Sequence, residues 1–268
     1  MKIRLGAIDF LNALPLCDKL SREDDRWDIV EALPSELANH LKSGEIDVGL
    51  VPQVEACRDP RYRIVPGHCI SCDGEVGSIL LFCRKAWRDL EVVAVDQASS
   101  SSVELLQVLR HLDGLPPLEL METRSDLSSF ESPNPPEAIL LIGDAALGHL
   151  SSPIERIDLG QAWKERTGLP FVFAVWLARE GLPTWVVSVL GEAAQLGLAS
   201  RDQFAIDFSR SHPEIFDRSA ASDYLHRCIC YHLGQEQQEA LVYFHRLRTE
   251  IDPRLDREWY PRYLEVDR

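Results

Sequence analysis

An apolar run from Phe171 to Ala178 restricts the possible folds of this chain more than any other segment. The run is too short to cross a bilayer as a helix, which needs about 20 apolar residues. Because it is rich in valine and aromatic residues, it predicts a strand that is buried on both faces. An amphipathic helix precedes it and stops at Gly168, shortly before Pro170. A strand covered on both faces is typical of an α/β sheet with helices on each side.

The first 52 residues alternate between strand and helix patterns. We predict strands at Lys2–Ile8, Trp27–Glu31 and Asp47–Val51, and helices at Asn12–Leu20 and from Pro34 to about Ser43. This order of elements predicts a parallel α/β sheet. A second unit begins with the strand Glu91–Val95 and includes a buried strand at Ala138–Ile142. After Pro183 the pattern becomes helical, at 184–197, 200–210, 213–216, 219–231 and 235–249.

We therefore expect two α/β lobes with a ligand cleft between them. The first lobe would be discontinuous, with residues 1–84 and 177–268, and the second would hold residues 85–176. The chain would cross between the lobes near Phe82–Lys85 and near Val175–Arg179. The helical tail would pack on the first lobe, because a run of helices after a βα region rarely forms a new sheet.

The charge of the chain excludes some partners. Its net charge is −15, from 28 basic and 43 acidic residues. A nucleic-acid or anionic-membrane surface needs a basic footprint, so we expect no nucleic-acid or membrane partner. A small anionic ligand remains possible, because helix N-termini bind carboxylates in proteins of any net charge. Asp9 and Asn12 interrupt the only stretch that resembles a secretory signal, so we expect a cytoplasmic protein.

The seven cysteines predict reduced thiols, because their number is odd and their spacing matches no disulfide scaffold. A zinc site is the alternative, built from two cysteine pairs and the two histidines beside them: Cys69 and Cys72, Cys228 and Cys230, His68 and His232. The spacing of the second pair is wrong for the usual zinc knuckle. We therefore expect no metal.

Four strand-to-helix corners carry the candidate site, because ligands of open α/β sheets bind beyond the carboxyl ends of the strands. These corners are Asp9–Asn12, Val51–Gln53, Asp96–Ser102 and Ile142–Ala145. The serine run Ser99–Ser102 is the clearest anion site, since its hydroxyls and the free N–H groups of the helix point the same way. A helix cap alone needs one hydroxyl. Asn12 and Asp144 could each cap a helix or act in the site, and the residues leave both alternatives open.

No familiar catalytic motif is present. The sequence has no Gly-rich phosphate loop, no HExxH and no GxSxG, and none of its eight histidines falls at the four corners. Metal-dependent or triad hydrolysis is therefore not indicated. The pattern favours chemistry that depends on positioning and hydrogen bonds.

Several blocks of the sequence resemble the chorismate dehydratases of the futalosine route to menaquinone. The matching blocks follow the order of that family: Phe10–Leu16, Pro34–Leu37, Ser43–Val48, Ile142–Leu147, Asp158–Gly160, Trp163 and Thr167–Trp176. The resemblance implies a two-lobed, type II periplasmic-binding-protein-like fold that acts as a cofactor-free enzyme. Its reaction removes water from chorismate and gives 3-[(1-carboxyvinyl)oxy]benzoate, with the substrate's own enolpyruvyl carboxylate as base.

The resemblance also assigns residues. Asn12 matches the family's active-site asparagine, Ser78 matches a serine that faces the substrate, and Ser101 with Ser102 matches a pair that binds a carboxylate. We thus predict Asn12 and Ser78 as catalytic. The predicted substrate-binding residues are Ser99, Ser101, Ser102, Gly143, Asp144, Val51 and Pro52.

The chain departs from the family at two positions. Ser100 stands where the family often has arginine, and Gln53 stands where serine or threonine is usual. The alternatives are a small-anion solute-binding or sensor protein of the same fold, and the related dihydroxynaphthoate synthase, which uses a catalytic histidine. The only partner that we expect is a small-molecule substrate, and the sequence does not predict the oligomeric state.

Overall fold

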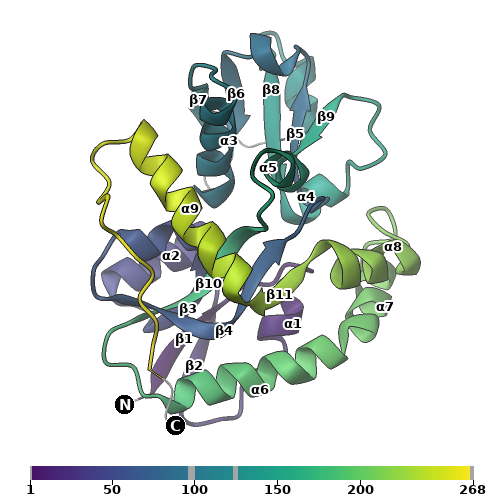
Figure 1. Cartoon of the computed structure of the whole chain (residues 1–268). Coiled ribbons are helices and arrows are strands. Elements are labelled where there is room, and N and C mark those ends of the chain that lie inside the picture. Colours follow the sequence, from purple (N-terminus) through teal and green to yellow (C-terminus); the bar gives the residue numbers. More distant parts are fainter. Residues whose placement is uncertain (1, 96–99, 123–125, 266–268) are drawn as a thin grey trace.

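The structure is a computed structural model that describes residues 2–95, 100–122 and 126–265. Two sheets, one above the other, form its framework (Figure 1). The first has the order β11-β4-β10-β3-β1-β2, from β1 (Ile3–Ala7), β2 (Trp27–Glu31), β3 (Val48–Pro52), β4 (Tyr62–Cys72), β10 (Phe171–Arg179) and β11 (Cys230–Leu233). The second has the order β7-β6-β8-β5-β9, from β5 (Ile79–Cys83), β6 (Val92–Val95), β7 (Glu119–Glu122), β8 (Ala138–Ile142) and β9 (Arg156–Asp158).

The strand β10 lies in the interior of the first sheet. It pairs antiparallel with β3 on one side and with β4 on the other. Every residue from Phe171 to Ala178 is buried, which confirms the strand predicted from the apolar run. The predicted parallel core is confirmed as well, since β1 pairs parallel with β2 and with β3.

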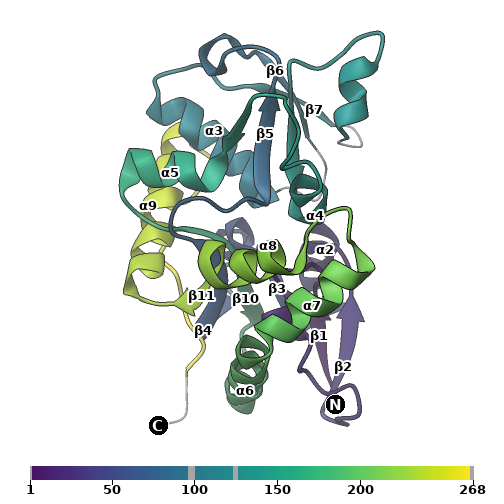
Figure 2. The same ribbon diagram turned by 90° about the vertical axis from the view of Figure 1, so that its right-hand side faces the viewer.

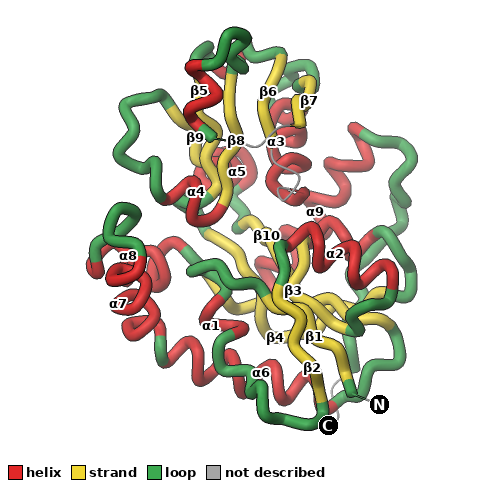
Figure 3. Tube along the Cα trace, turned by 180° about the vertical axis from the view of Figure 1, so that it is seen from behind, coloured by secondary structure: helices red, strands yellow, loops and turns green. Residues whose placement is uncertain are grey.

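Helices cover the faces of both sheets (Figure 3). Those of the first 170 residues are α1 (Leu14–Cys17), α2 (Pro34–Ser43), α3 (Ser100–Leu112), α4 (Gly143–Leu147) and α5 (Leu159–Thr167). Those of the tail are α6 (Trp185–Ala199), α7 (Arg201–Ser211), α8 (Arg218–Asp223) and α9 (Gln235–Ile251). Within the described residues, no helix has the length and apolar character needed to span a membrane.

The positions at which the chain passes from one sheet to the other differ from the predicted crossings near Phe82–Lys85 and Val175–Arg179. The strand β5, which was expected at the end of the first lobe, pairs with β8 and β9 in the second sheet. The chain therefore passes between the sheets at two short connections, residues 73–78 and residues 168–170, which we call the crossing segments. An apolar strand does not reveal its partner strand, because pairing depends on residues far away in the sequence. That the two halves move as lobes stays a prediction.

The tail is not wholly helical, contrary to the prediction. The predicted helix at 213–216 is a turn at residues 213–215. The predicted helix at 219–231 breaks into α8, one π-helical turn at Tyr224–Cys228, and β11. The strand β11 adds to the edge of β4. The short run Cys230–Leu233 carries too few residues to separate a strand from a helix by periodicity.

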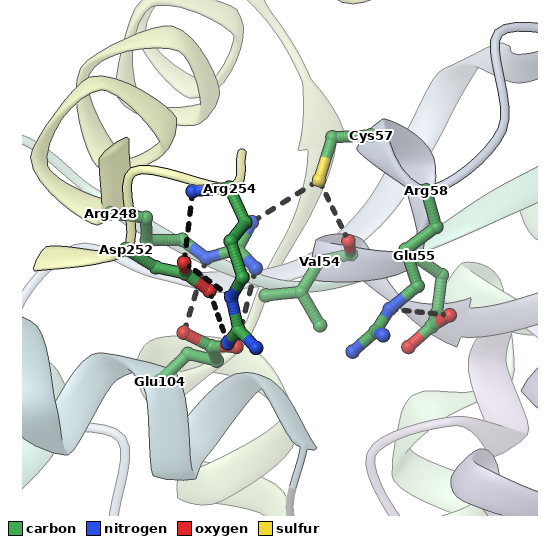
Figure 4. Close-up of polar contacts among 8 residues, drawn as sticks. All are labelled: Val54, Glu55, Cys57, Arg58, Glu104, Arg248, Asp252 and Arg254. Carbon is green, nitrogen blue, oxygen red and sulfur yellow. Dashed lines mark hydrogen bonds and ion pairs between the residues drawn. The ribbon is translucent and has the colours of Figure 1, made fainter. Parts of the chain in front are cut away.

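The helix α9 lies along one side of both sheets (Figure 2). Its Arg248 is buried and donates to Glu104 of α3 through Nε and Nη2, at 3.3 Å each. Through Nη1 it also donates to Sγ of Cys57, at 3.4 Å (Figure 4). Cys57 belongs to the 3-10 turn Gln53–Cys57 that follows β3. One guanidinium thus connects the tail, a helix beside the second sheet and a turn beside the first.

Candidate active site

A hollow lies where the two sheets meet, with a cavity volume of about 70 Å³. Its walls are mostly apolar and hold a few polar groups, which is the usual composition of a ligand site. The lining residues come from both sheets and from the corners between strands and helices: Ile8, Phe10, Asn12, Pro34, Pro52, Ile70, Ile79, Ser101, Ser102, Ile142, Gly143, Phe173 and Ala174.

The four predicted corners therefore converge, although not every predicted residue lines the cavity. Asn12, Pro52, Ser101, Ser102 and Gly143 do line it. The side chain of Val51 is fully buried and does not line the cavity. Pro52, the next residue of β3, does line it, and neighbouring residues of a strand point to opposite faces of the sheet. Ser99 lies outside the described residues.

Asn12 stands in the turn between β1 and α1. The N-cap of α1 is Ala13, and among the described residues no side chain caps this helix. Asn12 therefore lines the cavity without capping the helix, and its part in the reaction stays a prediction.

Ser78 ends the first crossing segment and is fully buried behind the cavity wall. Its Oγ accepts a hydrogen bond of 2.8 Å from the hydroxyl of Tyr224. Burial raises the pKa of Tyr224 well above its usual range, while hydrogen bonds with Ser78 and with the Asn12 side chain act in the opposite direction. The phenol therefore stays neutral. Sequence reasoning missed Tyr224, because a tyrosine within a helical pattern is read as a core residue.

Ser101 and Ser102 lie in the first turn of α3, and each is 5% exposed. The Ser101 hydroxyl donates to the carbonyl oxygen of Phe173 in β10, at 3.0 Å. Ser101 can donate to a ligand only after releasing this carbonyl, because a hydroxyl has a single proton. The first N–H groups of a helix have no partner within it, so the start of α3 offers backbone donors beside the Ser102 hydroxyl.

Gly143 and Asp144 begin α4 at the fourth corner. Gly143 has φ of 59°, a conformation that favours glycine, and its N–H donates to the carbonyl oxygen of Ser78 at 2.8 Å. Burial raises the pKa of Asp144, and the backbone of Leu11 acts in the opposite direction. Asp144 lines a neighbouring hollow instead of the cavity, together with Leu11, and it does not cap α4. Asp144 thus lies beside the loop that carries Asn12.

Asp158 anchors the first crossing segment. Its carboxylate accepts hydrogen bonds from the backbone N–H groups of Gly77, at 2.7 Å, and Val76, at 3.1 Å. It also caps α5 by accepting from the N–H of Gln161 at 3.0 Å. Burial raises the pKa of Asp158, more than these three donors lower it. Through these bonds, Asp158 holds in place the backbone of Val76 and Gly77, which leads to Ser78.

The cysteines and histidines of the zinc alternative come from neighbouring strands. Pairing of β4 with β11 sets Cys230 opposite Ser71 and His232 opposite His68. All seven cysteines are free thiols. Within the described ranges, no group of three or more metal-ligating side chains gathers in one place.

Comparison with known proteins gives the family. A model of the menaquinone biosynthesis family matches residues 3–250. The chain is 32% identical over 215 residues to the chorismate dehydratase of Thermus thermophilus, which covers 72% of this chain and 77% of that protein. It is 28% identical over 176 residues to the chorismate dehydratase of Campylobacter jejuni, covering 63% and 64%. A shorter match, 28% identical and 38% of each chain, relates it to the 1,4-dihydroxy-6-naphtoate synthase of Thermus thermophilus.

Solved structures give the fold. A protein from Archaeoglobus fulgidus superposes with a TM-score of 0.74 at 17% identity, covering 95% of this chain and 98% of that one. The periplasmic aliphatic sulphonate binding protein SsuA of Escherichia coli superposes with a TM-score of 0.63 at 16% identity, covering 100% and 94%. These likenesses confirm the predicted periplasmic-binding-protein-like architecture. The chain therefore belongs to the menaquinone biosynthesis family and is built on the periplasmic-binding-protein-like fold.

Proposed function

We propose that this protein is a chorismate dehydratase, a carbon-oxygen lyase that converts chorismate into 3-[(1-carboxyvinyl)oxy]benzoate and water. One observation carries the proposal beyond family membership. The asparagine and the serine pair that match the family's active-site residues come from corners about 90 residues apart, yet they line one cavity. The apolar walls suit a carbon ring, and the donors at the start of α3 suit a carboxylate.

The reaction is an elimination that leaves an aromatic ring. A proton leaves the ether-bearing ring carbon, the hydroxyl leaves the neighbouring carbon, and the two combine as water. Of the described residues that line the cavity, none is a carboxylate, a histidine or a lysine. This composition supports the substrate's enolpyruvyl carboxylate as the base. The protein would contribute orientation and exclusion of water, both of which lower the barrier.

The cavity is narrow for the proposed substrate. Its volume of about 70 Å³ is well below the roughly 300–1,000 Å³ of usual small-molecule sites. We infer that the sheets separate for entry, with bending at the crossing segments, and close again over the substrate.

Turnover of chorismate tests the proposal directly. The purified protein is mixed with chorismate, and the product is identified by its mass and its ultraviolet spectrum. The proposal fails if chorismate persists while a known chorismate dehydratase consumes it under the same conditions. A product other than the substituted benzoate would also contradict it.

Asn12→Ala tests the role of the first corner. We expect turnover to fall by about a hundredfold, the scale on which a lost orienting hydrogen bond acts in an active site. The melting temperature should stay close to that of the wild type, because Asn12 caps no helix. Near-normal turnover would remove Asn12 from the mechanism.

A further inference from the structure

Tyr224 is the point at which the tail reaches the candidate active site. Its side chain is 3% exposed, and its hydroxyl donates to Ser78, a residue from a distant part of the chain. The Asn12 side chain influences the pKa of the same hydroxyl, so it lies close by. It opens the π-helical turn Tyr224–Cys228, between α8 and β11. Such turns are rare and occur often at functional sites, since the extra residue redirects side chains.

The hydrogen bond between Tyr224 and Ser78 sets the role of each hydroxyl. The Tyr224 hydroxyl donates its only proton to Oγ of Ser78, at 2.8 Å. The Asn12 side chain lies beside the same phenol, where it acts to lower the pKa of Tyr224. Ser78 keeps its own proton for another acceptor, because its Oγ accepts from Tyr224.

We propose that Tyr224 is a positioning residue of the dehydration, whose hydroxyl holds Ser78 in its reactive orientation beside Asn12. This proposal rests on the proposed function. It gives the tail a part in the active site, in addition to its packing against the sheets. Because the buried phenol stays neutral, Tyr224 orients Ser78 without exchanging a proton during turnover.

Tyr224→Phe tests this role, since it removes one oxygen atom and keeps the ring that packs beside Phe216. We expect kcat to fall about tenfold, KM to stay within about twofold, and the pH profile to keep its shape. The matched control is Tyr231→Phe. Tyr231 is buried nearby in β11, and its hydroxyl has no hydrogen-bond partner among the residues that the structure describes. The control should retain wild-type kcat.

A double-mutant cycle shows whether Tyr224 acts through Ser78. If it does, the double variant Tyr224→Phe with Ser78→Ala will lose no more kcat than the more impaired single variant. Additive losses would overturn the proposal that Tyr224 acts through Ser78. Each variant is first checked for a cooperative melting transition, and a Tyr224→Phe protein without one would show a structural role and overturn the proposal as well.

The outcomes separate this proposal from the proposed function. If the wild-type protein does not convert chorismate, both fall together. If the wild type converts chorismate and Tyr224→Phe does so with unchanged kcat, only the role of Tyr224 is refuted. A fall in kcat for Tyr224→Phe, with normal kcat for Tyr231→Phe, supports it.

Discussion

Replacement of Asp158 by asparagine tests how the crossing segment is held. Both carboxylate oxygens of Asp158 are occupied, because Oδ1 accepts from Gln161 and Val76 while Oδ2 accepts from Gly77 and Val76. Asparagine has one acceptor oxygen and one amide that can only donate. In either orientation, therefore, the amide faces a backbone N–H that has lost its acceptor.

The magnitude follows from two opposing effects. An unpaired buried donor costs about 1–3 kcal/mol. Burial raises the pKa of Asp158, so the carboxylate carries a desolvation penalty that asparagine lacks, and this offsets part of the loss. We expect the free energy of unfolding to fall by about 1–2 kcal/mol, which lowers the melting temperature by roughly 2–4 °C for a chain of this size.

Urea unfolding and chorismate turnover measure the effect on each property. Turnover should fall by about threefold to tenfold at a temperature where the variant is folded, because the backbone before Ser78 loosens. Asp217→Asn is the matched control. Asp217 caps α8 through a single bond to the N–H of Ala220, and asparagine caps a helix as well as aspartate does. The reasoning is refuted if Asp158→Asn matches the control in both stability and turnover.

Two further predictions concern stability. Burial would raise the pKa of Asp47, but hydrogen bonds from the side chain and backbone of Arg4 outweigh this effect and leave the pKa lowered. Asp47→Asn should therefore melt at a lower temperature than the wild type at pH 7. This difference in melting temperature should vanish as the pH falls through the depressed pKa, below about 4. Equal differences in melting temperature at pH 7 and at pH 3 would contradict a lowered pKa of Asp47. Gly197→Ala would place a Cβ 2.1 Å from the carbonyl oxygen of Pro15, so α6 must shift away from α1. We expect the free energy of unfolding, measured with urea, to fall by about 1–3 kcal/mol. Gly191→Ala, in the same helix with open space around the new Cβ, should be neutral or stabilising.

Local patterns predicted the parts of the fold that depend on neighbouring residues. The alternation of strands and helices up to Pro52 fixes a parallel core, and the run from Phe171 fixes a buried strand. The corners at Asn12 and Ser101 could be found because a ligand site in such a sheet follows the strand ends. These inferences need only periodicity and the order of elements.

The remaining features depend on pairings between distant segments. The sheet to which β5 belongs is decided by β8 and β9, whose sequences lie far downstream. The hydroxyl of Tyr224 contacts Ser78, which lies 146 positions away in the sequence. Tyr224 is directed there by a π-helical turn, which sequence periodicity does not predict. The bonds from Asp158 to the crossing segment likewise join residues about 80 positions apart.

The late position of β11 in the sequence has a consequence for synthesis of the protein. During translation, one edge of the long strand β4 has no partner until residues 230–233 leave the ribosome. An unpaired edge of this length is a template for pairing with other chains. The first sheet, together with the π-helical turn that carries Tyr224 beside it, is completed only when most of the chain has been made. Nascent or truncated chains that stop before β11 should therefore aggregate and depend on chaperones.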